Sequence, residues 1–456
     1  MTQTETLSID QIRQQDRDHA WHPLMQHSTL DNRDLMVIQE ARGTTIVDGE
    51  GKSYLDAASG LWNVNVGYGR EEIAEAVYRQ IKELPFYPHS QINVPATQLA
   101  TRLAQILPGD LQHIFYCNSG SEANETAFKI ARQYGRQKYP GQNRYKIIAR
   151  YQGYHGFTFG AMSATGQVGR RVKFEPLVPG FLHVDPPYCY RCPLKLEYPG
   201  CGIACVEEIE QVIQKEGPET VAAVVVEPII GGGGVIIPPD EYLPRLREIC
   251  DHYGLLLILD EVITGFGRTG KIFASEHWGV EPDMITLAKG VSSGYLPLGA
   301  CAVTPEIFQT FLGDPQEDRE FSQVSTYGGH PVCCAAALAN LDILIGERLW
   351  ENSARVGAYL LEQLQALDSP FIGEVRGKGL MIAMELVDGD GALLDAERTA
   401  QVQARIRDEG VLVGRMSHAM PGPESMFFLS PPLILSSDEA DQIVAAFAAG
   451  LASIPA

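Results

Sequence analysis

Features that would point to a membrane or a nucleic acid are missing from this sequence. No apolar run reaches the roughly 18 residues that span a bilayer, and residues 1–6 lack the basic and apolar regions of a secretory signal. Basic residues are outnumbered, with 36 Lys and Arg against 57 Asp and Glu, which gives a formal net charge of −21. We therefore expect a cytoplasmic protein that has no nucleic-acid partner and no membrane partner.

A glycine-rich loop for nucleotide phosphates is lacking as well. The run of four glycines at residues 231–234 is followed neither by Gly-Lys-Ser/Thr nor by a helical pattern, because residues 235–239 read Val-Ile-Ile-Pro-Pro. We interpret these glycines as a place where the backbone approaches a bound ligand closely.

The nine cysteines are an odd number, and Cys117, Cys301 and Cys333 lie in apolar segments typical of small buried residues. This usage predicts a reducing compartment, the cytoplasm. Four other cysteines form the pattern C-x2-C-x8-C-x3-C, which has the spacing of a structural zinc site. These are Cys189, Cys192, Cys201 and Cys205. An insertion with reduced thiols is the alternative, and we assign no metal ligand.

Short apolar runs alternate with helical patterns between about residues 65 and 305. Because the runs are continuously apolar, they favour strands buried on both faces and therefore a mainly parallel sheet of the α/β class. The runs lie at residues 114–117, 146–149, 221–226, 255–259, 284–287 and 300–303. We predict one large domain over residues 65–331.

The two ends of the chain have a different pattern. We expect a polar helix at residues 7–20 and a hairpin with strands at residues 35–38, 44–48 and 53–56. After a helix from Pro331 to about Ile345, short strands at residues 411–413 and 427–429 alternate with helices. We predict that residues 1–64 and 332–456 together form a smaller α+β domain.

A lysine and an aspartate follow two of the apolar runs. Lys289 comes after residues 284–287, and Asp260 comes after residues 255–259. Pyridoxal phosphate chemistry requires such a pair, because the amine can form an imine with the cofactor aldehyde and the carboxylate can keep the pyridine nitrogen protonated. Taken alone, the pair is equally compatible with a lysine that reaches solvent at a strand end.

A small polar turn, Ser119-Gly120-Ser121, follows the run at residues 114–117 and opens a helical pattern. Free backbone N–H groups and the positive end of a helix dipole form an anion site at such a turn, and a serine hydroxyl adds a donor. The turn therefore predicts a phosphate site, although a plain N-cap serine would give the same pattern.

Three longer blocks occur in order along the chain: LDEVITGFGRTG at residues 259–270, AKGVSSGYLPLGA at residues 288–300 and STYGGHP at residues 325–331. With these blocks the chain resembles the class III, fold type I, pyridoxal phosphate-dependent aminotransferases over nearly its whole length. The resemblance implies a large domain with a mainly parallel central sheet and a smaller α+β domain.

The resemblance also implies a role for each matched residue. Lys289 would join the cofactor covalently and carry the proton in catalysis, and Asp260 would pair with the ring nitrogen. The other implied cofactor contacts are Ser119, Gly120 and Ser121 at the phosphate, Tyr154 and Val262 on the two ring faces, and His155 and Glu227. Thr326 would reach the phosphate of a neighbouring subunit, which implies a homodimer or a dimer of dimers.

Residues 61–70, LWNVNVGYGR, resemble the amine:pyruvate (omega-) transaminases. This resemblance implies that Trp62 and Tyr154 line the substrate pocket and that Arg415 binds the carboxylate of a keto acid. A core tryptophan and a surface arginine are the alternatives for Trp62 and Arg415. We expect ping-pong transfer from an amine donor, with a preference for S-amines, to pyruvate. Three alternatives remain. The donor could be taurine or β-alanine, the enzyme could be a mutase, racemase or decarboxylase on the same fold, or the protein could be an inactive relative.

Overall fold

The computed structural model describes residues 7–32, 35–416 and 424–454. Residues 1–6, on which the prediction about a secretory signal rests, lie outside this part of the chain. Within the described residues, no helix is both long enough and apolar enough to cross a membrane.

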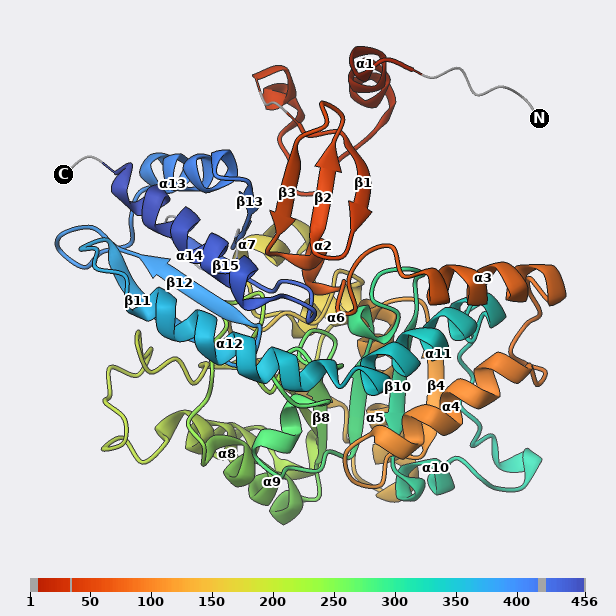
Figure 1. The fold of residues 1–456 in the computed structure, drawn as a ribbon. Coiled ribbons are helices and arrows are strands. Elements are labelled where there is room, and N and C mark those ends of the chain that lie inside the picture. Colours follow the sequence, from red (N-terminus) through yellow and green to blue (C-terminus); the bar gives the residue numbers. More distant parts are fainter. Residues whose placement is uncertain (1–6, 33–34, 417–423, 455–456) are drawn as a thin grey trace.

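The strands and helices follow one another along the whole chain (Figure 1). The strands are β1 (Ile38–Arg42), β2 (Thr45–Asp48), β3 (Ser53–Asp56), β4 (His113–Cys117), β5 (Lys146–Arg150), β6 (Phe181–Val184), β7 (Val221–Val226), β8 (Leu256–Asp260), β9 (Met284–Leu287), β10 (Gly299–Val303), β11 (Ile372–Gly377), β12 (Ile382–Leu386), β13 (Val411–Leu412), β14 (Gly414–Arg415) and β15 (Met426–Leu429). The α-helices are α1 (Ile9–His19), α2 (Ser59–Trp62), α3 (Glu71–Glu83), α4 (Val94–Ile106), α5 (Gly120–Lys138), α6 (Phe159–Ala164), α7 (Val168–Arg171), α8 (Ala204–Glu216), α9 (Tyr242–Tyr253), α10 (Pro305–Thr310), α11 (Pro331–Gly346), α12 (Leu349–Gln365), α13 (Ala396–Asp408) and α14 (Ser437–Ala452).

A seven-stranded sheet in the order β4-β10-β9-β8-β7-β5-β6 contains all six of the apolar runs seen in the sequence. The strands from β9 to β6 pair in parallel. β10 is antiparallel to both of its neighbours, so β4 runs in the direction of the parallel strands. The predicted α/β class with a mainly parallel sheet is confirmed. The edge strand β6 was not predicted, because its four residues are mostly half-buried and include the polar His183.

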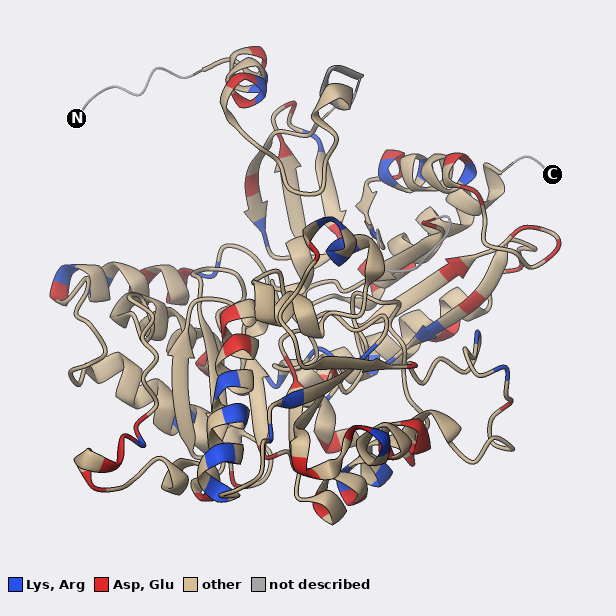
Figure 2. Ribbon diagram, turned by 180° about the vertical axis from the view of Figure 1, so that it is seen from behind, with Lys and Arg blue, Asp and Glu red and all other residues tan. Residues whose placement is uncertain are grey.

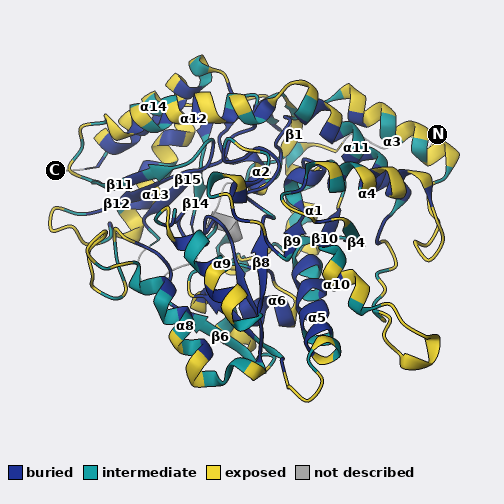
Figure 3. Cartoon of the chain, turned by 90° about the horizontal axis from the view of Figure 1, so that it is seen from below, coloured by how far each residue is buried: buried dark blue, intermediate teal, exposed yellow. Residues whose placement is uncertain are grey.

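Helices cover both faces of this sheet. Successive strand residues point to opposite faces, and in β5 Ile147 and Ala149 pack with α5 whereas Ile148 packs with α8 and α9. The strands are therefore buried between two helical layers, as Figure 3 shows by the dark blue strands inside helices whose outer turns are yellow. Charged residues lie mainly on the helices and loops, with both signs interspersed (Figure 2).

Two four-stranded sheets accompany the central one. In the first, β1, β2 and β3 form the expected hairpin arrangement, and β13 adds to β3 in parallel, so the two ends of the chain meet in one sheet. The second has the order β11-β12-β15-β14 and is built from the last part of the chain. The domain boundaries at residues 64/65 and 331/332 stay predictions. The helix α11 begins at the boundary near residue 331 and packs on α3 and α4.

One strand of the hairpin was placed too early. We expected it at residues 35–38, whereas β1 covers Ile38–Arg42 and pairs with β2 through Arg42 and Thr45. β1 is largely exposed, so its side chains need not be apolar, and hydrophobicity is a poor marker of its position.

Candidate active site

The predicted site residues gather at one edge of the central sheet. Because β4, β5, β7, β8 and β9 run in the same direction, their carboxyl ends lie at that edge, where ligands bind in open α/β sheets. Asp260 is the last residue of β8, Glu227 comes directly after β7, and Lys289 comes two residues after β9. Tyr154 and His155 follow β5, and Ser119 to Ser121 follow β4.

Lys289 has an unusual backbone and an unusual amine. Its φ is 46°, in the left-handed region that residues other than glycine seldom adopt. Burial lowers the pKa of the Lys289 amine to about 8, against the attraction of the carboxylates of Asp260 and Glu227. Nevertheless the amine forms no ion pair or hydrogen bond within the described part of the chain. A buried amine with a lowered pKa and no partner is suited to act as a nucleophile or base.

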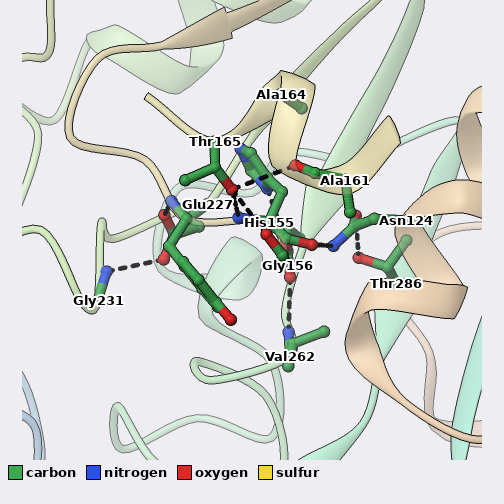
Figure 4. Close-up of polar contacts among 12 residues, drawn as sticks. Asn124, His155, Gly156, Ala161, Ala164, Thr165, Glu227, Gly231, Val262 and Thr286 are labelled. Carbon is green, nitrogen blue, oxygen red and sulfur yellow. Dashed lines mark hydrogen bonds and ion pairs between the residues drawn. The ribbon is translucent and has the colours of Figure 1, made fainter. Parts of the chain in front are cut away.

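Asp260 is buried and held by three donors. Its Oδ2 lies 2.8 Å from both Asn124 Nδ2 and His155 Nδ1, and its Oδ1 accepts the Val262 N–H at 3.1 Å. Figure 4 labels these three partners, Asn124, His155 and Val262, which lie close together. Only 4% of the Asp260 surface is exposed, so these bonds keep an acid fixed where water is scarce.

Glu227 ties two loops together beside that carboxylate. Its Oε1 accepts the Tyr154 N–H at 2.9 Å, and its Oε2 accepts the Gly231 N–H at 2.8 Å (Figure 4). Burial raises the pKa of Glu227, and the nearby His155 opposes this rise. The glycine run that we expected beside a ligand is thus held next to the site. Within this run, a Cβ on Gly233 would lie 2.1 Å from the carbonyl oxygen of Gln152, so the close approach is to another part of the backbone.

The start of α5 provides the candidate phosphate site. Ser119 is the N-cap, and its Oγ accepts the Glu122 N–H at 3.2 Å, so this hydroxyl has a structural use. The N–H groups of Gly120 and Ser121 donate to no acceptor among the described residues. A Cβ on Gly120 would lie 2.9 Å from Val262 Cγ1, which shows how closely this turn packs on the loop after β8.

Three further predicted residues lie around this edge in different settings. Thr326 is exposed, as a residue that faces a second subunit would be. Trp62 is buried and stacks on Phe428, with ring centroids 4.1 Å apart, within a cluster of apolar side chains. Arg415 is half-buried on β14, and its Nε donates to the Glu424 carbonyl at 2.6 Å. Whether these three contact substrate or cofactor stays a prediction.

The residues present fit pyridoxal phosphate. When bound, that group supplies an aldehyde conjugated to an electron-accepting ring. Lys289 offers an amine that has no partner among the described residues, Asp260 offers a fixed carboxylate, and the start of α5 offers two N–H donors for a phosphate. These are the three kinds of group that the cofactor requires.

A comparison with protein families settles the class. The model of the family "Aminotransferase class-III" matches residues 28–451. The chain belongs to this family. Class III aminotransferases are pyridoxal phosphate-dependent transferases, so the predicted family, fold type and enzyme class are confirmed.

Relatives of this aminotransferase match it over almost their full length. Taurine–pyruvate aminotransferase of Bilophila wadsworthia is 41% identical over 440 residues, which is 94% of each chain. The structure of a thermostable (S)-enantioselective omega-transaminase from Thermomicrobium roseum superposes with a TM-score of 0.92 at 43% identity, covering 98% of this chain and 99% of that one. An amine transaminase from an uncultivated Pseudomonas species, solved with bound pyridoxal phosphate, has a TM-score of 0.88 at 39% identity and coverages of 95% and 98%.

The pocket lined by the four-cysteine loop includes none of the candidate active-site residues. Cys189, Cys192, Cys201 and Cys205 line one pocket, so the spacing does bring them together. In the described part of the chain, however, no three His, Cys, Asp or Glu side chains are arranged to hold a metal ion. The cysteines expected to be buried, Cys117, Cys301 and Cys333, are buried.

Sequence reasoning missed Asn124 and Thr286, which position Asp260. Asn124 Nδ2 donates both to Asp260 and to the His155 carbonyl, at 2.8 and 2.9 Å, and its Oδ1 accepts the Thr286 hydroxyl at 3.1 Å. Both residues are fully buried. A signal existed for Thr286, which is a polar residue inside the apolar run of β9. Asn124 carries no such signal, because its neighbours in the sequence include Glu122 and Glu125.

Proposed function

We propose that this aminotransferase uses pyridoxal phosphate to move an amino group from an amine or ω-amino donor to pyruvate or a similar keto acid. The observation that carries the proposal is the buried Lys289 amine, which has no hydrogen-bond or ion-pair partner in the part of the chain that the structure describes. Burial lowers its pKa to about 8, and the carboxylates of Asp260 and Glu227 oppose this shift. The names of the taurine–pyruvate and omega-transaminase relatives support the choice of donor and acceptor.

Each residue of the site would contribute through its position. Lys289 is neutral in an appreciable fraction of molecules near pH 8, so its amine can accept a proton from the carbon that carries the substrate nitrogen and return it elsewhere. Asp260, fixed by Asn124 and His155, would keep a proton on the ring nitrogen. Tyr154 and Val262 would hold the ring from its two faces, and the start of α5 would hold the phosphate.

The test is a donor panel on the protein loaded with cofactor. We expect alanine from pyruvate with at least one of propylamine, (S)-1-phenylethylamine, taurine and β-alanine, in a one-to-one ratio with amine consumed. The variant Lys289→Ala should form no alanine, whereas Lys215→Ala, which changes an exposed lysine on α8, should act like the wild type. Amine loss without alanine would favour a decarboxylase, mutase or racemase instead, and no reaction with any donor would contradict the proposal.

We also propose that the active unit is a homodimer, alone or paired into a tetramer. A patch of exposed apolar side chains supports this: Phe86, Tyr87, Ile92, Val94, Val324 and Tyr327. Phe86 contacts Tyr327, with ring centroids 5.7 Å apart, so the two segments form one surface. Thr326 lies in the same surface, as expected of a residue that reaches a neighbouring subunit.

Nine unpaired thiols support a reducing location, the cytoplasm.

A further inference from the structure

Arg376 joins the C-terminal sheet to the glycine run at residues 231–234, which forms a turn. It lies on β11, and its Nε and Nη2 both donate to the Gly234 carbonyl, at 2.8 and 2.5 Å. Its Nε also donates to the Val235 carbonyl at 3.2 Å. Only 10% of the Arg376 side chain is exposed, so these charge-assisted hydrogen bonds are largely shielded from water.

The same turn is bonded internally and is held at its other end by the active site. The Gly231 carbonyl accepts the N–H groups of Gly234 and Val235, at 3.1 and 3.0 Å. The Gly231 N–H donates to Glu227 Oε2 at 2.8 Å (Figure 4). Because the turn is closed by its own hydrogen bonds, a shift of the carbonyl that Arg376 holds also shifts the N–H that Glu227 holds.

The loop that carries Tyr154 contacts this turn in two places. Glu227 Oε1 accepts the Tyr154 N–H at 2.9 Å, so one carboxylate bridges the turn and the loop. A Cβ on Gly233 would collide with the carbonyl oxygen of Gln152, so the turn also packs on the backbone two residues before Tyr154. The φ of Gln152 is 63°, a left-handed conformation that persists only where the surrounding structure holds it.

Arg376 is itself fixed by its neighbours. Its Nη1 pairs with Glu374 on the same strand, and its guanidinium carbon is 4.8 Å from the ring centroid of Tyr188. The Tyr188 hydroxyl donates at 2.5 Å to the buried carboxylate of Glu385 on β12. The C-terminal sheet therefore presents a well-held cation to the turn.

We propose that Arg376 is a positioning residue, which fixes Tyr154 against the cofactor ring through the glycine turn and Glu227. This inference rests on the role proposed for Tyr154 and deepens the proposed function. It also gives the contact between the C-terminal sheet and the active site a consequence, because a displacement of β11 changes how firmly the Tyr154 loop is held.

The first experiment measures hydrogen exchange in the cofactor-free chain. In Arg376→Met, backbone amides in peptides covering residues 152–157 and 229–236 should exchange about tenfold faster than in the wild type, since a hydrogen bond to a charged group is worth a factor of this order. Peptides from α13 and α14 should not change. Arg376→Lys keeps a charged donor and should recover part of the protection. Arg398→Met removes an arginine that pairs with Asp395 and should leave both peptides unchanged.

A second variant tests the same link without altering β11. Gly233→Ala places a methyl group where the Gln152 carbonyl lies, so residues 152–157 should again exchange faster. Gly232→Ala is the matched control, because its Cβ would lie 3.7 Å from the nearest neighbour, Gln167 Nε2, and it should exchange like the wild type.

A double-variant comparison tests whether Glu227 transmits the effect. The affinity for pyridoxal phosphate, titrated by absorbance, should fall about tenfold in Arg376→Met. Glu227→Gln should also lower it, because the amide cannot accept both N–H groups. In the double variant the loss should be smaller than the product of the two single losses, since both changes break one path. A loss equal to that product would show independent effects and overturn the proposal.

These measurements do not depend on which amine is the donor. Unchanged exchange at residues 152–157 in Arg376→Met, or an equal increase throughout the chain, would show that Arg376 only stabilises β11 and would overturn its positioning role. Absence of alanine from every donor, together with the expected changes in exchange and cofactor affinity, would overturn the transaminase proposal and leave the role of Arg376 supported.

Discussion

At Lys289, two unfavourable features coincide in one residue. A left-handed backbone at a residue other than glycine costs about 1–3 kcal/mol, and φ is 46° at this lysine. Burial disfavours the charged amine, and this lowers the pKa to about 8. Neither feature helps the cofactor-free protein to fold. Both features are expected of a catalytic residue, because the backbone conformation fixes the direction of the side chain and burial makes the amine lose its proton more readily.

This balance predicts a pH-dependent gain in stability when the lysine is replaced. The pKa of the amine is near 8 in the folded protein and 10.5 ordinarily, so the unfolded chain holds the proton more strongly between these values. The destabilisation is complete below pH 8 and disappears as the pH rises through 10.5. Lys289→Met should therefore raise the Tm of the cofactor-free protein at pH 7 and lose most of that gain at pH 10.5. Scanning calorimetry checks this, with Lys215→Met as control; a gain that does not change with pH would rule out the titration.

At the scale of elements, strands that are buried on both faces could be predicted and exposed ones could not. The six apolar runs became β4, β5, β7, β8, β9 and β10, because a strand between two helical layers must be apolar throughout. β1 is exposed and β6 lies at an edge, so neither carries that pattern. Site residues directly after the buried strands were predictable for the same reason. Asn124 lies inside α5, so only the folded chain shows that its side chain reaches Asp260.

At the start of α5, the sequence alone does not show whether the Ser119 hydroxyl binds phosphate or caps the helix. Ser119 was expected to hold phosphate, and in the structure its hydroxyl caps the helix by accepting the Glu122 N–H. Replacing Ser119 with Ala should therefore lower the free energy of unfolding of the cofactor-free protein by about 1 kcal/mol, as is typical for loss of an N-cap. Thr158 is a matched control, because it is the N-cap of α6 and forms no capping bond, so Thr158→Ala should have a smaller effect.

Urea unfolding of the three proteins without cofactor measures both effects. Affinity for pyridoxal phosphate, titrated separately, shows whether Ser119 also contacts the phosphate. If Ser119→Ala unfolds like the wild type and loses only cofactor affinity, the hydroxyl serves the ligand and not the helix.

At the scale of the whole molecule, the active site lies beside the exposed apolar patch formed by residues 86–94 and 324–327. Asn93 Nδ2 donates to the Gly329 carbonyl at 3.1 Å, which joins the two segments behind the patch. Asn118 precedes Ser119, the N-cap of α5, and its Nδ2 donates to the Ser325 hydroxyl at 2.7 Å, so the same segment touches the candidate phosphate site. A second chain that covered the patch would therefore also border the phosphate.

This arrangement predicts that assembly and activity are lost together. Val324 is 89% exposed and Leu312 is 53% exposed, but Leu312 lies outside the patch. Val324→Glu places a charge where an apolar partner surface is expected, and burial of an unpaired charge costs several kcal/mol. We expect this variant to sediment as a monomer at concentrations where the wild type is a dimer or tetramer, with weaker cofactor binding and at least tenfold lower transamination.

Leu312→Glu tests whether any new surface charge has the same result, and it should assemble and react like the wild type. Sedimentation velocity and the rate of alanine formation at equal chain concentration check both variants. A Val324→Glu monomer with full activity per chain would show that one chain completes the site, and the role expected of Thr326 would then be wrong. A fully assembled Val324→Glu protein would show instead that the partner binds elsewhere, because an unpaired charge at an exposed position is tolerated only where nothing covers it.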